Sequence, residues 1–146
     1  MFSRTVCDCD QCKSCCKRQP GHILPGQMEK IADYLKQSLD EVKKKFWASP
    51  GARVQDSKTG LQYQIGTITP RFDRRKKACV FLTDDGQCSI HVVAPFGCSH
   101  FDACTMDAVE AQRRAVWGMT QILGSEDYRK LRAELPFADH YKPQRY

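Results

Sequence analysis

The sequence lacks a long run of apolar residues, and this excludes the commonest kind of membrane anchor. No stretch of its 146 residues approaches the roughly 18 apolar residues that a membrane-spanning helix needs. The opening segment, MFSRTVCDCD, has no apolar core of the kind that a secretory signal carries. We therefore expect a cytoplasmic protein with no membrane partner, in which thiols stay reduced.

Internal repeats and low-complexity linkers are also missing. A length of 146 residues is typical of one domain, and 41% hydrophobic with 27% charged residues is ordinary for a globular chain. We therefore expect a single domain over residues 1–146 with a modest core.

Cysteine is what the chain has in abundance, in two separate groups. Five of the nine cysteines lie within residues 7–16, and the other four lie within residues 79–104. An odd number of cysteines fits poorly with a disulfide framework, and the expected compartment keeps thiols reduced. Metal binding, dithiol redox chemistry and burial are the uses that remain.

The amino-terminal group has the spacing of metal ligands. Cys9, Cys12 and Cys15 keep a two-residue interval, which lets successive thiolates turn toward one centre. The interval suits zinc, but a run of three with one remote cysteine is closer to a ferredoxin-like cluster. The adjacent Cys16 cannot readily aim at the same point, so one of the pair binds a second metal, bridges two metals or packs as an apolar residue.

Apolar residues at helical spacing predict four helices, and an alternating segment predicts a strand. Ser38 and Glu41 have the spacing of a capping box, and Gly124 is a helix stop. The segment ASPGA is expected to break the chain before the strand. The predicted helices cover residues 27–37, 38–47, 105–123 and 125–135, the strand covers 61–68, and an irregular tail covers 136–146.

The segment CVFLTDDGQCSIH predicts a β-hairpin, with arms at 80–82 and 88–90 around an Asp-Gly turn. This places Cys79 and Cys88 on paired strands, and a loop then delivers Cys98. The fold class is therefore α+β: a few helices and a short hairpin, irregular around a cysteine-ligated metal site. About sixty residues separate the two cysteine groups, so a buried core is needed to bring them to one site.

The motif CDQCKSCC resembles the signature of the CxxCxxCC family, the YkgJ-type zinc- or iron-chelating domain. The later segment CVFLTDDGQCSIHVVAPFGCSHF is similar to the second half of the family pattern. The resemblance covers about residues 9–118 and leaves the helix end and tail, 119–146, outside it. It implies metal or cluster chelation by eight cysteines: Cys9, Cys12, Cys15, Cys16, Cys79, Cys88, Cys98 and Cys104.

The chain departs from the family pattern at two positions. Ala94 stands where the family has an arginine before the proline, and Ser99 stands where an arginine follows the cysteine. If those arginines support the site electrostatically, Arg71 or Arg74 is expected to replace them. Cys7 falls outside the pattern and is interpreted as a free thiol.

The four histidines are weaker candidates than the cysteines. His91 has a zinc-compatible spacing from Cys88, but we favour a role in strand packing. His100 is a candidate for a hydrogen bond to a coordinating sulfur. His22, in a turn-rich connector, and His140, in the tail, are expected to face solvent.

The interpretation that follows is a metal-binding protein with an electron-transfer or redox accessory role. The triple cysteine spacing favours an iron–sulfur cluster of the 4Fe–4S type, and Zn²⁺ remains open. The sequence has no HExxH motif, no Cys-His-Asn order and no glycine-rich phosphate loop, so hydrolysis is not favoured. Whether the protein is an enzyme stays open; if it is one, we expect an iron–sulfur oxidoreductase or a component of one.

The alternative is a zinc-stabilised module that binds nucleic acid or protein and has no catalytic activity. The basic runs RFDRRKK and KKK support it, although each is also typical of a solvated surface. The formal net charge of +6 would fall to about +2 if eight thiolates held two divalent cations. The two cysteine groups also lack the ligand spacing of a zinc finger. Nucleic acid therefore has little support as a partner, and a redox or other protein is the better expectation.

Overall fold

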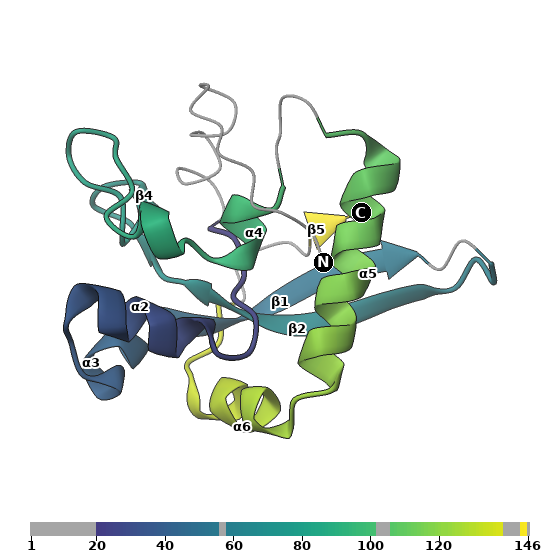
Figure 1. Cartoon of the computed structure of the whole chain (residues 1–146), viewed down its shortest axis with the longest axis horizontal. Coiled ribbons are helices and arrows are strands. Elements are labelled where there is room, and N and C mark those ends of the chain that lie inside the picture. Colours follow the sequence, from purple (N-terminus) through teal and green to yellow (C-terminus); the bar gives the residue numbers. More distant parts are fainter. Residues whose placement is uncertain (1–19, 56–57, 102–105, 139–143, 146) are drawn as a thin grey trace.

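The centre of the molecule is a pair of long antiparallel strands, β1 (Phe46–Gln55) and β2 (Gln62–Pro70), with helices around it (Figure 1). The structure is a computed structural model, and it confirms the α+β class. Only the backbone is described for Ala52, Gln144 and Arg145. The described residues are 20–55, 58–101, 106–138 and 144–145.

Four helices lie where the apolar periodicity predicts them, with shorter bounds. In Figure 1, α2 and α3 lie at one end of the β1–β2 hairpin, α5 crosses it, and α6 lies below. The predicted start of the third helix at residue 105 lies outside the described residues. No helix within the described ranges is long and apolar enough to cross a membrane. The four are α2 (Gln27–Leu35), α3 (Leu39–Lys43), α5 (Ala108–Leu123) and α6 (Glu126–Glu134).

Side-chain caps explain where three of these helices begin. The Glu41 amide donates to Ser38 Oγ at 3.2 Å, as the capping pattern predicts. Asp107 and Ser125 cap α5 and α6 in the same way. The structure also confirms Gly124 as the stop of α5. Local sequence is therefore sufficient to define these ends.

The predicted helix over residues 38–47 is too long, because its last part is a strand. The helix α3 ends at Lys43, and β1 begins at Phe46, which pairs with Pro70 and is fully buried. Trp47 pairs with Thr69 in the same ladder. Aromatic side chains fit a pleated, half-buried surface well, and pairing with β2 overrides the helical pattern here.

The expected break at ASPGA is also wrong, since β1 runs through it with a bulge. The register shifts between Ser49 and Ala52. Gly51 has φ 94°, and a Cβ at this position would collide with the Ile65 carbonyl. The bulge therefore requires glycine at this position, and it absorbs the irregular segment without ending the strand.

The predicted pairing of 80–82 with 88–90 is largely wrong, because Cys79 belongs to a different two-stranded hairpin. This hairpin is β3 (Phe72–Asp73) against β4 (Ala78–Cys79), in which Cys79 pairs with Phe72. Beyond β4, the predicted arms meet at one isolated bridge, Leu82 to Cys88. The predicted turn is confirmed, because Gly86 has φ 80° and its amide donates to the Thr83 carbonyl at 3.0 Å. Two short helical turns follow: η2 (His91–Val93) and α4 (Phe96–Ser99).

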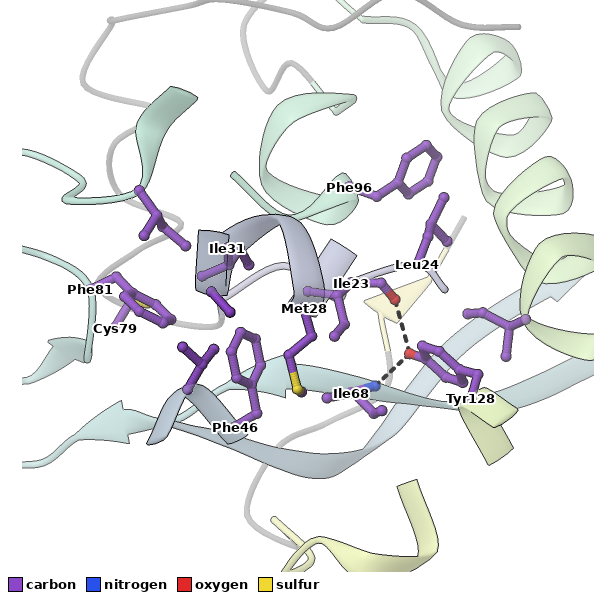
Figure 2. Close-up of a cluster of buried hydrophobic side chains, with 14 residues drawn as sticks. Ile23, Leu24, Met28, Ile31, Phe46, Ile68, Cys79, Phe81, Phe96 and Tyr128 are labelled. Carbon is purple, nitrogen blue, oxygen red and sulfur yellow. Dashed lines mark hydrogen bonds between the residues drawn. The ribbon is translucent and has the colours of Figure 1, made fainter. Parts of the chain in front are cut away.

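The connector, which we define as residues 20–26, precedes α2. A buried hydrophobic cluster joins this connector to the sheet and to the cysteine-bearing segments (Figure 2). Cys79 is 6% exposed and belongs to this cluster. The Tyr128 hydroxyl receives a hydrogen bond from the Ile68 amide at 2.8 Å and donates to the Ile23 carbonyl at 2.9 Å. Burial raises the pKa of Tyr128, although the Ile68 amide opposes that shift. One side chain of α6 thus ties β2 to the connector.

The tail is more regular than expected. The Ala48 amide donates to the Pro136 carbonyl at 2.8 Å, and the Ala138 amide donates to the Ala48 carbonyl at 2.7 Å. Further on, β5 (Gln144–Arg145) pairs with β1 in parallel. The prediction of an irregular tail is therefore wrong in part, because the free edge of β1 supplies hydrogen bonds that no local pattern in the tail indicates.

Candidate metal centre

Three of the eight predicted ligands lie in the described part of the chain: Cys79, Cys88 and Cys98. Within the described ranges, no group of three or more His, Cys, Asp or Glu side chains is placed to hold a metal ion. These ranges alone therefore do not supply a complete ligand set. Cys9, Cys12, Cys15, Cys16 and Cys104 lie outside the described residues, as do Cys7 and His140.

Cys79 lies at the end of β4, and Cys88 lies across an isolated bridge from Leu82, three residues further along the chain. The Leu82 amide donates to the Cys79 carbonyl at 2.9 Å, and Leu82 also forms the isolated bridge to Cys88. Burial raises the pKa of the Cys88 thiol, while a backbone hydrogen bond from Ile90 acts in the opposite direction. The Cys88 thiol is therefore harder to ionise than an ordinary cysteine, and a cation that binds it must displace its proton.

Cys98 lies in α4 and receives a hydrogen bond from a distant part of the chain. The Gly21 amide donates to Cys98 Sγ at 3.2 Å, across 77 residues of sequence. The Cys98 amide is bonded to the Pro95 carbonyl at 2.9 Å. An N–H group pointing at a sulfur favours its thiolate form, because the hydrogen bond is stronger to the charged acceptor.

Two glycines allow this contact. A Cβ on Gly21 would collide with the backbone of Gly97 and Cys98, and a Cβ on Gly97 would come within 2.5 Å of the His22 amide nitrogen. The Gly97 amide also donates to the His22 carbonyl at 2.9 Å. The connector and α4 therefore approach so closely that neither position tolerates a side chain.

This contact fixes the connector that follows the amino-terminal cysteines. The Ile23 amide donates to the Ile68 carbonyl at 2.9 Å, so the connector is held by the sheet as well as by α4. Pro20 follows Cys16 by four residues, a span of at most about 14 Å of extended chain. The chain after the first cysteine group is thus anchored beside Cys98, a cysteine of the second group.

Aromatic rings surround the part of α4 that carries Cys98. Phe96 is 1% exposed. Its ring centroid lies 4.6 Å from that of His100, in a stacked arrangement, and 5.4 to 5.6 Å from those of Trp117, Phe101 and His22. Phe96 is therefore a core residue, and the cluster excludes water from one side of α4.

The expectation that His22 faces solvent is wrong. The contact between Gly21 and Gly97 draws the connector inward, and His22 is only 5% exposed, beside the rings of Phe96 and Phe101. Burial lowers its pKa to about 4, so the imidazole is neutral at pH 7. No local signal reveals this, because the turn-rich segment PGHILPG is typical of an exposed loop.

The other described histidines differ in their surroundings. His100 Nδ1 lies 2.9 Å from Ser99 Oγ, so this ring nitrogen has the neighbouring hydroxyl as a hydrogen-bond partner. The hydrogen bond from His100 to a coordinating sulfur stays a prediction. His91 is exposed and begins the 3₁₀ turn η2. Its expected role in strand packing is wrong, because no strand includes this residue.

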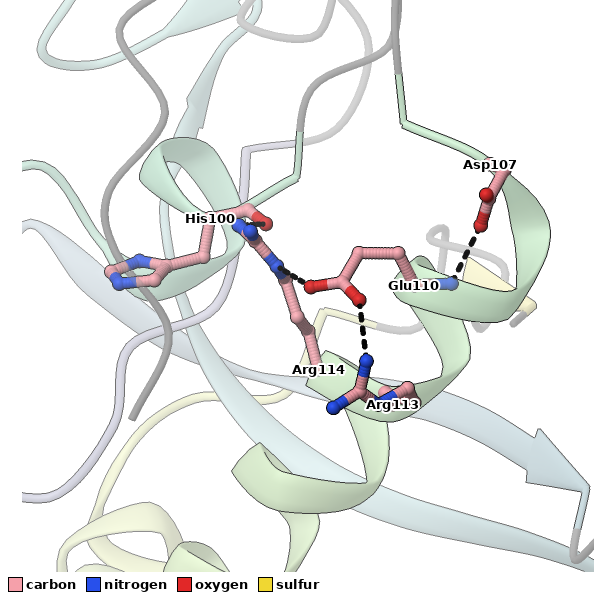
Figure 3. A network of polar contacts seen from close by, with 5 residues as sticks. All are labelled: His100, Asp107, Glu110, Arg113 and Arg114. Atoms are coloured by element: carbon pink, nitrogen blue, oxygen red, sulfur yellow. Dashed lines mark hydrogen bonds and ion pairs between the residues drawn. The ribbon is translucent and has the colours of Figure 1, made fainter.

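The expectation that Arg71 or Arg74 supports the site stays a prediction. Arg71 Nε donates to the Phe46 carbonyl at 3.0 Å, and Arg74 is exposed on the β3–β4 turn. A third arginine, Arg114 of α5, donates to the carbonyl of His100, two residues after Cys98, at 2.6 Å (Figure 3). Sequence reasoning missed Arg114, although its place directly before Ala115 on the apolar face of a predicted helix was a usable signal.

Comparison with known proteins gives one match. The family model CxxCxxCC, described as "Putative zinc- or iron-chelating domain", matches residues 8–118. The match contains the eight cysteines of the predicted ligand set and the connector between them. Neither the curated proteins nor the solved structures gave a significant match.

Proposed function

The chain belongs to the CxxCxxCC family of zinc- or iron-chelating domains, and from this premise we propose that both cysteine groups serve one metal centre. The family match supports metal binding in general. The finer proposal is that the centre draws on the eight cysteines that the family resemblance implies, four from each group. The proposed ligands are Cys9, Cys12, Cys15, Cys16, Cys79, Cys88, Cys98 and Cys104.

The observation that carries this proposal is the hydrogen bond from the Gly21 amide to Cys98 Sγ. It joins the segment that follows the first cysteine group to a sulfur of the second. Both glycines at this contact, Gly21 and Gly97, lie where a side chain would collide with backbone. A close approach with these requirements is a specific feature of the fold, and it supports a common site.

The chain between Cys88 and Cys98 is also folded back on itself. The turns η2 and α4 follow each other directly, and the Phe96 amide donates to Gln27 Oε1 at 3.0 Å. The same oxygen accepts from the Leu24 amide at 2.8 Å. Gln27 therefore fixes α4 against the connector, which supports bringing Cys88 and Cys98 toward the amino-terminal group.

The ligand type narrows the chemistry of such a centre. A set composed of thiolates gives closed coordination and leaves no position for a metal-bound water, so we favour a structural or electron-carrying role over hydrolysis. Within that role we propose an iron–sulfur cluster of the 4Fe–4S type, because of the triple spacing at Cys9, Cys12 and Cys15. One such cluster takes four thiolates, so the other four of the eight would hold a second metal group. Zn²⁺ is the alternative occupant, and a redox or other protein is the partner class that we propose.

The basic runs favour a nucleic-acid module less than the sequence suggested. Lys43 Nζ forms an ion pair with Glu134 at 2.7 Å. Lys45 Nζ lies 5.5 Å from the centroid of the Phe81 ring, and Lys76 Nζ donates to the Leu82 carbonyl at 3.2 Å. Several of these cations thus contribute to the fold itself, so we do not propose nucleic acid as the partner.

The test is metal content after purification without oxygen. Iron, zinc and acid-labile sulfide would be quantified per chain for the wild type and for Cys98→Ser, Cys12→Ser and Cys7→Ser. We expect near-stoichiometric metal in the wild type, loss of most of it in the first two variants, and retention in Cys7→Ser, which lies outside the motif. Full retention in Cys98→Ser and Cys12→Ser, or no metal in the wild type, would contradict the proposal.

The same samples identify the occupant. Iron with sulfide and a broad absorption band near about 400 nm indicates a thiolate-bound cluster and directs the search toward redox partners. Zinc without colour indicates a structural or metal-handling protein and directs the search toward binding partners.

A further inference from the structure

The turn between β3 and β4 carries most of the net charge of the chain. Residues 71–77 include five cations and one carboxylate, a net charge of +4, whereas the whole chain has a formal net charge of +6. The turn itself is composed of four exposed cations: Arg74, Arg75, Lys76 and Lys77. The rest of the chain is therefore close to neutral, and the positive potential is concentrated at this turn.

Backbone and side-chain contacts give this turn a defined shape. The Arg75 amide donates to Asp73 Oδ1 at 2.9 Å, so the carboxylate at the start of the turn is used by the backbone. Lys77 has φ 55° and brings the chain into β4 through the left-handed conformation. Lys76 Nζ donates to the Leu82 carbonyl at 3.2 Å. The cations are therefore presented by a fixed turn.

Three of the four cations are not used by the described part of the fold. Within the described ranges, no ion pair or side-chain hydrogen bond involves Arg74, Arg75 or Lys77. In contrast, Lys43 Nζ lies 2.7 Å from Glu134 Oε2 in an ion pair. The charges of the turn are therefore available to an acidic partner.

A second basic run, distant in sequence, adjoins this turn. The Arg71 amide donates to the Lys45 carbonyl at 2.8 Å. Lys45 Nζ lies 5.5 Å from the centroid of the Phe81 ring, next to the residue whose carbonyl Lys76 contacts. In Figure 1, β4 and α3 accordingly lie at the same end of the molecule. We define this surface as the basic end, which is composed of residues 44–45 and 74–77.

Carboxylates border the basic end, and they favour a protein over a nucleic acid as its partner. Asp84 and Asp85 are exposed on the turn that follows Leu82. A phosphate backbone carries charge of one sign only, so these two carboxylates would repel it. A protein surface can instead place acidic side chains against the cations and neutral or basic side chains against the two carboxylates.

We propose that the basic end is a docking surface for an acidic protein. The class of partner rests on the proposed function, whereas the surface does not depend on what the metal centre holds. Charge complementarity of this kind increases the rate of association and sets the orientation of the partner, and it weakens as salt is added. Cys79 follows Lys77 by two residues, so the partner would contact the hairpin that carries a proposed ligand.

The experiment measures the binding of two charged probes to the full chain at low salt. The probes are poly-L-glutamate of about 20 residues, which presents carboxylates, and a single-stranded DNA of the same length, which presents phosphates. Fluorescence anisotropy gives the Kd of each. The test variant is Arg74→Glu with Arg75→Glu. The matched control is Lys58→Glu with Lys130→Glu, which makes the same change in net charge at two other exposed positions.

We expect the wild type to bind poly-L-glutamate more tightly than DNA and to lose affinity as salt is added. The Kd for poly-L-glutamate should rise at least about tenfold in the test variant and stay within about twofold of the wild type in the control. If the test variant does not fold, Arg74→Gln with Arg75→Gln replaces it, and the expected rise in Kd is then at least about threefold.

Equal losses in the test variant and the control would overturn the inference, because binding would then follow net charge and not this surface. Tighter binding of DNA, lost in the test variant alone, would also overturn it and assign the basic end to nucleic acid. Metal content of the same samples separates this inference from the proposed function. A metal-loaded wild type that does not bind poly-L-glutamate contradicts the inference alone, and a metal-free wild type that binds it contradicts the proposed function alone.

Discussion

The β1–β2 hairpin and the cysteine loops, which we define as residues 78–101, keep their shapes by different means. The hairpin has a long antiparallel ladder and a buried hydroxyl pair, Ser49 with Thr67 at 2.7 Å. The cysteine loops have a two-residue strand, one isolated bridge and two single turns. Contacts from distant residues, namely Gly21, Gln27 and Arg114, fix these loops.

The difference teaches that the hairpin combines its own ladder with the elements packed on it, whereas the cysteine loops have little ladder of their own and depend on what docks against them. Regular ladders with buried side chains exchange their amide protons slowly, and short turns with few local hydrogen bonds open more readily. A metal ion bound through Cys79, Cys88 and Cys98 would add the cross-links that the loops lack. The predictions below test this division of the molecule, beginning with the largest expected effect.

Removal of the metal should affect the two regions unequally. After chelation, we expect amide exchange within residues 78–101 to rise by at least about a hundredfold, because metal binding contributes directly to the folding of its ligand loops. Exchange within β1 and β2 should change far less. The measurement is hydrogen exchange with mass spectrometry, and an equal rise in both regions would contradict the comparison.

The variant Gly97→Ala should destabilise the contact between the connector and α4. The added methyl group would collide with the backbone of Gly21 and His22, so we expect a loss of at least about 3 kcal/mol in the free energy of unfolding, with faster metal loss. Gly86→Ala is the control, because a Cβ there meets nothing within 4 Å and the cost is the strain of its φ of 80°. Denaturant unfolding would measure both; similar losses in the two variants would argue against a tight contact.

The variant Tyr128→Phe should destabilise the junction of β2, α6 and the connector. It leaves the buried Ile68 amide and Ile23 carbonyl without this hydroxyl, so we expect a loss of about 2 to 3 kcal/mol in the free energy of unfolding. Tyr63→Phe is the control, since Tyr63 is 43% exposed on β2. A loss below about 0.5 kcal/mol for Tyr128→Phe would show that this junction does not depend on the hydroxyl.

The buried His22 should make stability depend on pH. Its pKa is about 4 when folded and 6.5 when unfolded, so the unfolded chain gains a proton first as the pH falls. The contribution of the neutral His22 to the free energy of unfolding is therefore fully present above pH 6.5 and declines between pH 6.5 and 4. At pH 5 the free energy of unfolding is lower by about 2 kcal/mol. Unfolding at pH 7 and pH 5 would be compared for the wild type, His22→Gln and His91→Gln.

Only His22→Gln should reduce the decline between the two pH values, because His91 is exposed. Protonation of metal ligands also weakens the protein at low pH, but it acts on all three chains alike. The difference between the chains therefore isolates the contribution of His22. A decline in His22→Gln equal to that of the wild type would contradict burial of this ring.

Local patterns in the sequence predicted the parts of the fold that local interactions determine. The cap at Ser38, the stop at Gly124 and the strand over β2 all depend on neighbouring residues, and the structure confirms each of them. The start of β1 at Phe46 could not be found in this way. It depends on pairing with Pro70, which lies far along the chain and overrides the helical pattern of KKKFW.

The same distinction applies to the candidate centre. Cysteine spacing singled out the amino-terminal candidates, because two-residue intervals have a direct chemical meaning, and the family resemblance added the remote ones. The contact of Gly21 with Cys98 and that of Arg114 with His100 both join segments distant in sequence. Gly21 carries no local signature for such a contact, and the position of Arg114 on the apolar face of a helix indicates burial without indicating its partner, so only the three-dimensional arrangement reveals these contacts.

The bond between the Gly21 amide and Cys98 Sγ also has a consequence for the order in which the protein is made. The two residues are 77 positions apart. At the usual rate of translation, the ribosome needs roughly 4 to 15 seconds to add that length of chain. The amino-terminal thiols are therefore synthesised well before the sulfurs proposed to share their metal, and a metal delivered to the nascent chain would meet an incomplete set of ligands.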